Sequence, residues 1–80
     1  MTYIATFYSH FGAVRIKKDL ARLGIEATLM PVPRALSSSC GTCAQFTTDS
    51  LPEFSHPDEI EQVVTVVNDS YSVVFSTMDD

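Results

Sequence analysis

One segment of the chain has the spacing of an amphipathic helix, and this spacing limits the folds that are open to the sequence. Between His10 and Leu23, apolar side chains recur every three or four positions and so share one helix face: Ala13, Ile16, Leu20 and Leu23. The hydroxyl of Ser9 can accept an unpaired backbone N–H at the helix start, and Gly24 tolerates the left-handed conformation that ends many helices. We therefore predict a helix over residues 10–23.

The segments on both sides of this helix are typical of strands. Residues 3–8 are rich in aromatic and β-branched side chains, and residues 25–30 show the two-residue alternation of a half-buried strand. Pro31 and Pro33 end this second strand because both lack a backbone donor. After a loop of small residues, the composition of residues 43–48 favours a short third strand.

The second half of the chain predicts another helix and a last strand. Pro57, after His56, suits the first position of a helix, and isoleucine and valine follow at helical spacing at positions 60, 63, 64 and 67. The β-branched run over residues 63–67 has the opposite propensity, towards a strand. We expect a helix from about His56 to Asn68 and a strand over residues 71–78.

The order strand, helix, strand, strand, helix, strand predicts a single α+β domain over residues 1–80. With right-handed crossovers it most often forms a ferredoxin-like fold, a four-stranded antiparallel sheet with two helices on one face. The end of the first strand, the start of the first helix and the loop after the second strand then share one end of the sheet. We therefore expect Ser9 and His10 to lie near Cys40 and Cys43, and six aromatic residues to lie in or beside the core: Tyr3, Phe7, Phe11, Phe46, Phe54 and Phe75.

Charged residues are divided unequally between the two halves of the chain. All five basic residues lie in the first half, whereas eight of the ten acidic residues lie in the second half, and the net charge is −5. This balance argues against general nucleic-acid binding, which needs a net basic face. The basic residues form either an ordinary solvated surface or a helix face on which an acidic partner docks: Arg15, Lys17, Lys18, Arg22 and Arg34.

The sequence carries no signal for a membrane or for secretion. No stretch approaches the roughly 18 to 20 apolar residues that a membrane span needs. Residues 1–6 lack the basic start and the long apolar run of a secretory signal. We therefore expect a cytoplasmic protein that does not associate with a membrane.

Cys40 and Cys43 form a Cys-x-x-Cys pair in the segment Ser-Ser-Ser-Cys-Gly-Thr-Cys of residues 37–43. A disulfide between them would close almost no loop and stabilise little, so in a reducing compartment the pair indicates redox, metal or thiol-transfer chemistry. A reactive cysteine needs its thiolate stabilised. Gly41 permits a tight turn with exposed amides, the serines supply hydroxyl donors and Arg34 supplies a positive charge.

Other interpretations of the same residues stay open. The two cysteines are either reactive or simply small apolar residues, and His10 is either a base or cation beside Cys40 or an exposed helix residue. Arg34 binds an anion at the thiol or forms a surface ion pair. Structural zinc usually wants four ligands, and only His10 and His56 could join the cysteines, neither at finger-like spacing. We expect no zinc site and no organic cofactor, although a soft metal held by two thiolates stays open.

Three segments of the chain are similar to a known family: residues 5–10 (Ala-Thr-Phe-Tyr-Ser-His), 23–25 (Leu-Gly-Ile) and 31–41 (Pro-Val-Pro-Arg-Ala-Leu-Ser-Ser-Ser-Cys-Gly). They resemble the small bacterial family of selenium/sulfur carrier protein-like proteins, over most of the chain. The resemblance implies a cytosolic ferredoxin-like domain that handles selenium or sulfur, with these matching positions: Pro33, Arg34, Ser38, Cys40 and Gly41. Many relatives lack a cysteine at the position of Cys43, which implies an accessory role for it.

The favoured hypothesis is a carrier rather than an enzyme with its own turnover. Cys40 accepts a sulfur or selenium atom from a donor protein and passes it to an acceptor protein, while Arg34, Gly41, Ser38 and Ser39 stabilise the anion. The first alternative is a thiol–disulfide or redox-sensing module in which Cys40 attacks and Cys43 resolves. The others are a module that binds soft metals or a protein, and a regulatory domain that binds a ligand or forms a homodimer through an exposed sheet edge.

Overall fold

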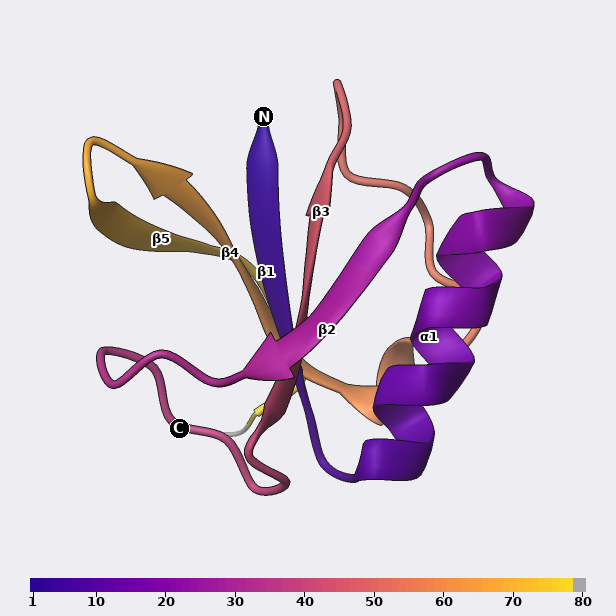
Figure 1. The fold of residues 1–80 in the computed structure, drawn as a ribbon, viewed down its shortest axis with the longest axis horizontal. Helices are drawn as coiled ribbons and strands as arrows, with labels where there is room; N and C mark the ends of the chain where they lie inside the picture. The colour runs from indigo at the N-terminus through magenta and orange to yellow at the C-terminus, as the bar shows by residue number, and fades with distance from the viewer. Residues whose placement is uncertain (79–80) are drawn as a thin grey trace.

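The computed structural model describes residues 1–78, in which one α-helix packs on a five-stranded antiparallel sheet (Figure 1). The elements in chain order are β1 (Thr2–Phe7), α1 (His10–Arg22), β2 (Ala27–Pro31), β3 (Thr42–Thr47), the 3-10 turn η1 (Pro57–Glu59), β4 (Ile60–Val67) and β5 (Ser70–Ser76). The strands lie in the order β2-β3-β1-β4-β5, and every neighbouring pair is antiparallel. The predicted α+β class is confirmed, whereas the predicted four strands and two helices are wrong in number.

The second predicted helix is wrong because its residues form β4. Only the 3-10 turn Pro57–Glu59 remains of it, and Ile60–Val67 pair with β1 on one side and β5 on the other. The first six residues of β4 are all buried. A strand covered on both faces carries a continuous apolar run, and such a run contains helix-like spacings by coincidence. The β-branched propensity of residues 63–67 was the better indicator.

The first strand-helix-strand unit has the predicted layout. β1 and β2 both run antiparallel to β3, which lies between them, so β1 and β2 are parallel to each other. β5 is an additional edge strand that forms a hairpin with β4. Asn68 and Asp69 make its two-residue turn at φ 51° and 64°, the positive values that this type of tight hairpin requires.

Helix α1 begins and ends close to the predicted residues. The Ser9 hydroxyl accepts the Gly12 N–H at 3.1 Å, which confirms the predicted cap, and Gly24 adopts the left-handed region at φ 79°. The buried helix face contains Gly12, Ala13, Ile16, Asp19 and Leu20. Leu23, expected on this face, instead follows the last helical residue and is 58% exposed.

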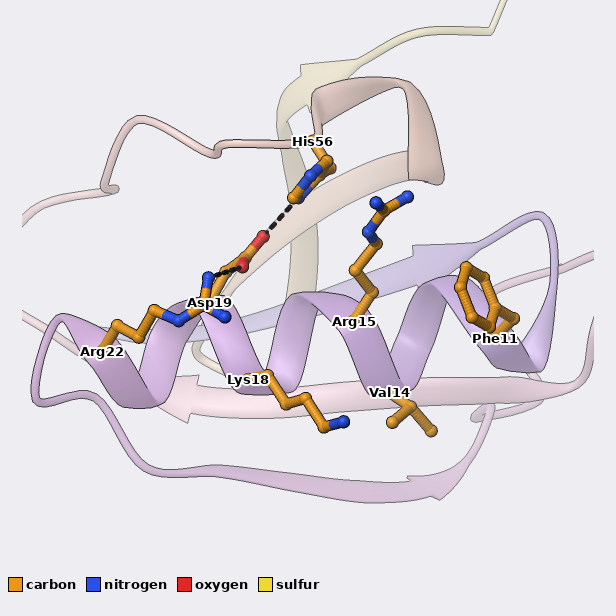
Figure 2. A pocket seen from close by; sticks show the side chains of 7 residues that line it. All are labelled: Phe11, Val14, Arg15, Lys18, Asp19, Arg22 and His56. Carbon is orange, nitrogen blue, oxygen red and sulfur yellow. Dashed lines mark hydrogen bonds and ion pairs between the residues drawn. The ribbon is translucent and has the colours of Figure 1, made fainter.

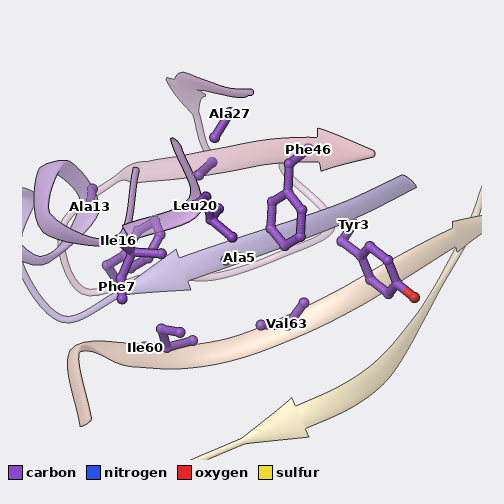
Figure 3. Packing of buried hydrophobic residues seen from close by; sticks show 11 residues of the cluster. Tyr3, Ala5, Phe7, Ala13, Ile16, Leu20, Ala27, Phe46, Ile60 and Val63 are labelled. Carbon is purple, nitrogen blue, oxygen red and sulfur yellow. The ribbon is translucent and has the colours of Figure 1, made fainter. Parts of the chain in front are cut away.

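Apolar clusters cover both faces of the sheet. The helix-side cluster lies between α1 and the sheet (Figure 3) and contains Tyr3, Ala5, Phe7, Ala13, Ile16, Leu20, Ala27, Ala44, Phe46, Ile60 and Val63. The second-face cluster contains Ile4, Cys43 and Val64. Val32 and Leu36 pack against the second-face cluster, so the loop between β2 and β3 is attached to the face of the sheet that has no helix.

Five of the six aromatic residues expected in or beside the core lie there. Tyr3, Phe7 and Phe46 are buried, while Phe54 and Phe75 pack against the helix-side cluster. The expectation is wrong for Phe11, which is 69% exposed because it points away from the buried face of α1. Among the described residues, no helix has the length and apolar character of a membrane span.

Candidate thiol site

The loop of residues 32–41, which carries Cys40, is held to the sheet by backbone and side-chain hydrogen bonds. At its base, the Val32 N–H donates to the Gly41 carbonyl at 3.2 Å. The Ser38 hydroxyl donates to the carbonyl of Phe7, the last residue of β1, at 3.1 Å. This bond confirms that the loop after β2 reaches the end of β1, as the predicted topology requires.

A buried carboxylate on β4 provides the strongest anchor of the loop. Glu61 is 5% exposed and accepts the Ser39 hydroxyl at 2.6 Å and the Ser39 N–H at 3.2 and 3.3 Å to its two oxygens. In the ladder with β1, Gln62 faces Thr6 and Ile60 faces Phe7, so Glu61 is the extra residue of a β-bulge. Bulges change the direction of side chains and are common beside functional sites, and this bulge leaves Glu61 unpaired in the ladder with β1.

The Cys40 thiol is half-buried at the end of this anchored loop. Its Sγ donates to the Thr42 carbonyl at 3.4 Å and lies 3.9 Å from the Ser38 hydroxyl, which also accepts the Cys40 N–H at 3.4 Å. Gly41 follows at φ 74°, a left-handed conformation that favours glycine. The arrangement leaves Cys40 partly exposed beside the Ser38 hydroxyl, whose hydrogen is donated to the Phe7 carbonyl.

Cys43 occupies a different environment from Cys40. It is fully buried in the second-face cluster, where its Sγ donates to the Pro31 carbonyl at 3.6 Å, whereas Cys40 packs against the helix-side cluster. Burial raises the pKa of the Cys43 thiol because it desolvates the thiolate, and negative charge on Cys40 raises it further. Both thiols are free, and Cys43 is therefore the less prepared of the two to react as a thiolate.

The raised pKa of Cys43 predicts a dependence of stability on pH. A thiol whose pKa is higher in the folded state keeps its proton there while the unfolded chain loses it, above an ordinary pKa of about 8.5. The stabilisation is complete below that pH and is lost as the pH rises through the folded-state value. We expect the free energy of unfolding to fall by up to about 1.4 kcal/mol per pH unit in this window through Cys43 alone.

Urea denaturation of the wild type and of Cys43→Ala, each measured across this alkaline range, checks the prediction. Every other ionisable group is common to the two proteins, so the difference between their slopes isolates Cys43. Equal slopes in the two proteins would show that the thiol is solvated in the folded state.

Several of the predicted site residues do not contact Cys40. Arg34 lies in the turn between Pro33 and Leu36, is exposed, and forms no hydrogen bond or ion pair with any residue in the range 1–78. His10 is the exposed first residue of α1 and likewise has no side-chain partner within that range. The structure thus groups Ser38, Ser39 and Gly41 with Cys40 and leaves Arg34 and His10 in solvent.

Two residues with defined contacts, Glu61 and His56, were not predicted from the sequence. Glu61 could have been noticed as an acidic residue within the start of an apolar, β-branched run, between Ile60 and Val63. His56 was expected only to start a helix, but its Nδ1 lies 2.7 Å from Oδ2 of the buried Asp19. Within residues 1–78, no three side chains of His, Cys, Asp or Glu are grouped so that they could hold a metal ion.

The fold and the anchored loop define a small α+β protein with one accessible thiol at an end of its sheet. A family model described as "Putative Se/S carrier protein-like" matches residues 2–66 of the 80-residue chain, a range that includes the whole Cys40 loop and ends before β5. The chain belongs to this family, as its motif suggested. No curated protein and no solved structure was found to match it.

Proposed function

We propose that the protein carries sulfur or selenium on Cys40 and passes the atom to an acceptor protein. The observation that carries the proposal is the contrast between the two thiols: Cys40 is accessible in an anchored loop, and Cys43 is fully buried. Membership of the selenium/sulfur carrier-like family supports the same chemistry. An accessible thiol at a fixed position suits transfer between proteins, because the partner must reach the sulfur atom without unfolding the loop.

The loading step transfers one sulfur atom from a persulfide on the donor protein to the Cys40 thiol. The Cys40 thiolate attacks the outer sulfur of a persulfide on the donor protein, the sulfur–sulfur bond of the donor breaks, and the donor leaves as a thiolate. A new sulfur–sulfur bond forms on Cys40, and the proton of the persulfide moves with the outer sulfur. No oxidant or reductant is consumed, and transfer to the acceptor repeats the same exchange. With selenium, the same exchange builds a selenium–sulfur bond.

The residues around Cys40 have defined parts in this proposal. Ser38 lies 3.9 Å from the sulfur, and its one hydroxyl hydrogen can turn from the Phe7 carbonyl to the added anionic atom, with loss of the bond to Phe7. Gly41 supplies the left-handed turn that brings the thiol to the loop surface. Arg34 and His10 are exposed and do not contact Cys40. In this proposal they supply positive charge or a proton only in a complex, when the donor or acceptor protein is bound.

Mass spectrometry of the intact protein tests the proposal. The reduced protein is incubated with a cysteine desulfurase and cysteine, and we expect the wild type to gain the mass of one sulfur atom. Cys40→Ser should gain none, whereas Cys43→Ser should gain the same mass as the wild type. A wild type that stays unmodified, or that behaves like Cys40→Ser, would refute a carrier function at Cys40.

A further inference from the structure

The outer surface of α1 carries a shallow groove that the thiol chemistry does not use. It has a volume of about 270 Å³ and is lined by Phe11, Val14, Arg15, Lys18, Asp19 and Arg22 of α1 and by His56 of the segment opposite the helix (Figure 2). The helical positions recur at intervals of three or four residues and form one stripe. At 1.5 Å per residue, this stripe extends for about 16 Å along the helix.

Positive side chains outnumber negative ones in the groove, although the protein as a whole is acidic. Three cations line the groove against one carboxylate, in a chain of net charge −5. The Asp19 carboxylate is covered, because Arg22 at 3.1 Å and His56 at 2.7 Å occupy its two oxygens and only 7% of the side chain is exposed. Lys18 is exposed and has no ion pair within residues 1–78, so the surface of the stripe presents positive charge.

An exposed aromatic side chain lies at one end of the stripe. Phe11 is 69% exposed, and the Arg15 guanidinium lies 5.6 Å from the centre of its ring. The ion pair of Arg15 with Glu59 is long, at 3.8 Å, so the guanidinium is also available to a ligand. Aromatic residues and arginine are enriched in protein–protein interfaces, where a central apolar contact is surrounded by polar ones.

We propose that this stripe is a docking surface for a segment of a partner protein that carries several acidic side chains and a pair of large apolar side chains. The apolar pair packs on Phe11 and Val14, and the acidic side chains face Arg15, Lys18 and Arg22. Charge complementarity selects this partner, while the eight acidic residues of the second half of the chain disfavour a nucleic acid.

The position of the stripe relates it to the thiol end of the molecule. Phe11 lies in the first turn of α1, which follows β1 directly, and the last residue of β1 accepts the hydrogen bond of Ser38. A partner seated on Phe11 is therefore bound at the end of the sheet that carries the Cys40 loop. The docking proposal does not require sulfur transfer and can be tested without it.

The test is an NMR titration of the ¹⁵N-labelled protein with the acidic peptide acetyl-Glu-Asp-Leu-Phe-Glu-Glu-amide. We expect shift changes at the amides of α1 and at His56, with an affinity that falls as salt is added. Lys18→Glu should weaken binding at least about tenfold, because it reverses a charge inside the stripe. Lys17→Glu makes the same charge change on the same helix outside the groove and should alter the affinity by less than about threefold.

Two further measurements separate a specific surface from a general charge effect. Phe11→Ala should weaken binding of this peptide, and a peptide with Gly-Gly in place of Leu-Phe should bind more weakly to the wild type. Equal loss in Lys17→Glu and Lys18→Glu, equal affinity for both peptides, or shifts away from α1 would each overturn the proposal. Concentration-dependent shifts on α1 without peptide would overturn it too, because the occupant would then be a second copy of the chain.

Discussion

Under native conditions, iodoacetamide is expected to alkylate Cys40 on the order of a hundred times faster than Cys43. Cys40 is half-buried in a surface loop, whereas Cys43 is fully buried beneath side chains of that loop on the second face of the sheet. A reagent reaches Cys43 only after a local or global opening, and an opening that costs about 3 kcal/mol slows the reaction by about two orders of magnitude. The raised pKa of the Cys43 thiol slows it further.

Peptide mass spectrometry at timed intervals measures both rates in one sample. Cys43→Ala should leave the rate at Cys40 within about a factor of two of the wild type, since the two thiols pack against different clusters. In denaturant the two rates should converge. Similar rates in the folded protein would contradict the burial of Cys43 and would restore the dithiol mechanism, in which Cys43 resolves an oxidised Cys40, as the better hypothesis.

This difference bears on the choice among the hypotheses for the Cys-x-x-Cys pair. A thiol–disulfide exchange between Cys40 and Cys43 needs both sulfur atoms on a common path, yet each packs against a different face of the sheet. Cys43 is fixed in β3 by its pairing with Thr6 and Met30, so a disulfide with Cys40 would require the loop or the strand to move. A one-thiol carrier needs no such movement, because Cys40 alone meets the partner.

The fold was predictable where local signals and tertiary structure agree. The Ser9 cap, the apolar spacing of α1 and the glycine after it predict the helix, and its short connections to strands predict the first β-α-β unit. The helix predicted over residues 60–67 was wrong because a strand buried on both faces lacks the two-residue alternation that distinguishes a strand from a helix. In β4 the β-branched propensity outweighs the helical spacing, because β1 and β5 supply hydrogen-bond partners for the β4 backbone.

The candidate site was predictable only in its local part. The serines, Gly41 and Cys40 are adjacent in sequence, so their grouping follows from the chain itself. Glu61 is different, because its contact with Ser39 depends on the register of β4 beside β1 and on the bulge in that ladder. A predicted helix over these residues places Glu61 in another setting, so the error in the fold also concealed the anchor of the loop.

Replacing Glu61 by alanine should destabilise the protein by about 2 kcal/mol, because charge-assisted hydrogen bonds to both donors of Ser39 are lost together. Glu61→Gln keeps one acceptor oxygen and should lose about half as much. Ser39→Ala removes only the hydroxyl bond. The loss in each variant can be measured by urea denaturation, with Glu53→Ala as the matched control, since Glu53 is exposed and has no side-chain partner within residues 1–78.

The local effect of the Glu61 substitution distinguishes an anchor from a merely stabilising residue. Hydrogen exchange at the Ser39 amide should accelerate in Glu61→Ala while exchange in α1 follows the global stability, because the bulged carboxylate is the acceptor for that N–H. The Glu61→Ala and Ser39→Ala losses should be non-additive in a double-mutant cycle, since both remove the same hydroxyl–carboxylate bond.

Additive losses, or a Glu61→Ala variant as stable as Glu53→Ala, would show that the carboxylate does not hold the loop. Cys40 would then be presented by the Ser38 bond to Phe7 and by the packing of Val32 and Leu36 alone.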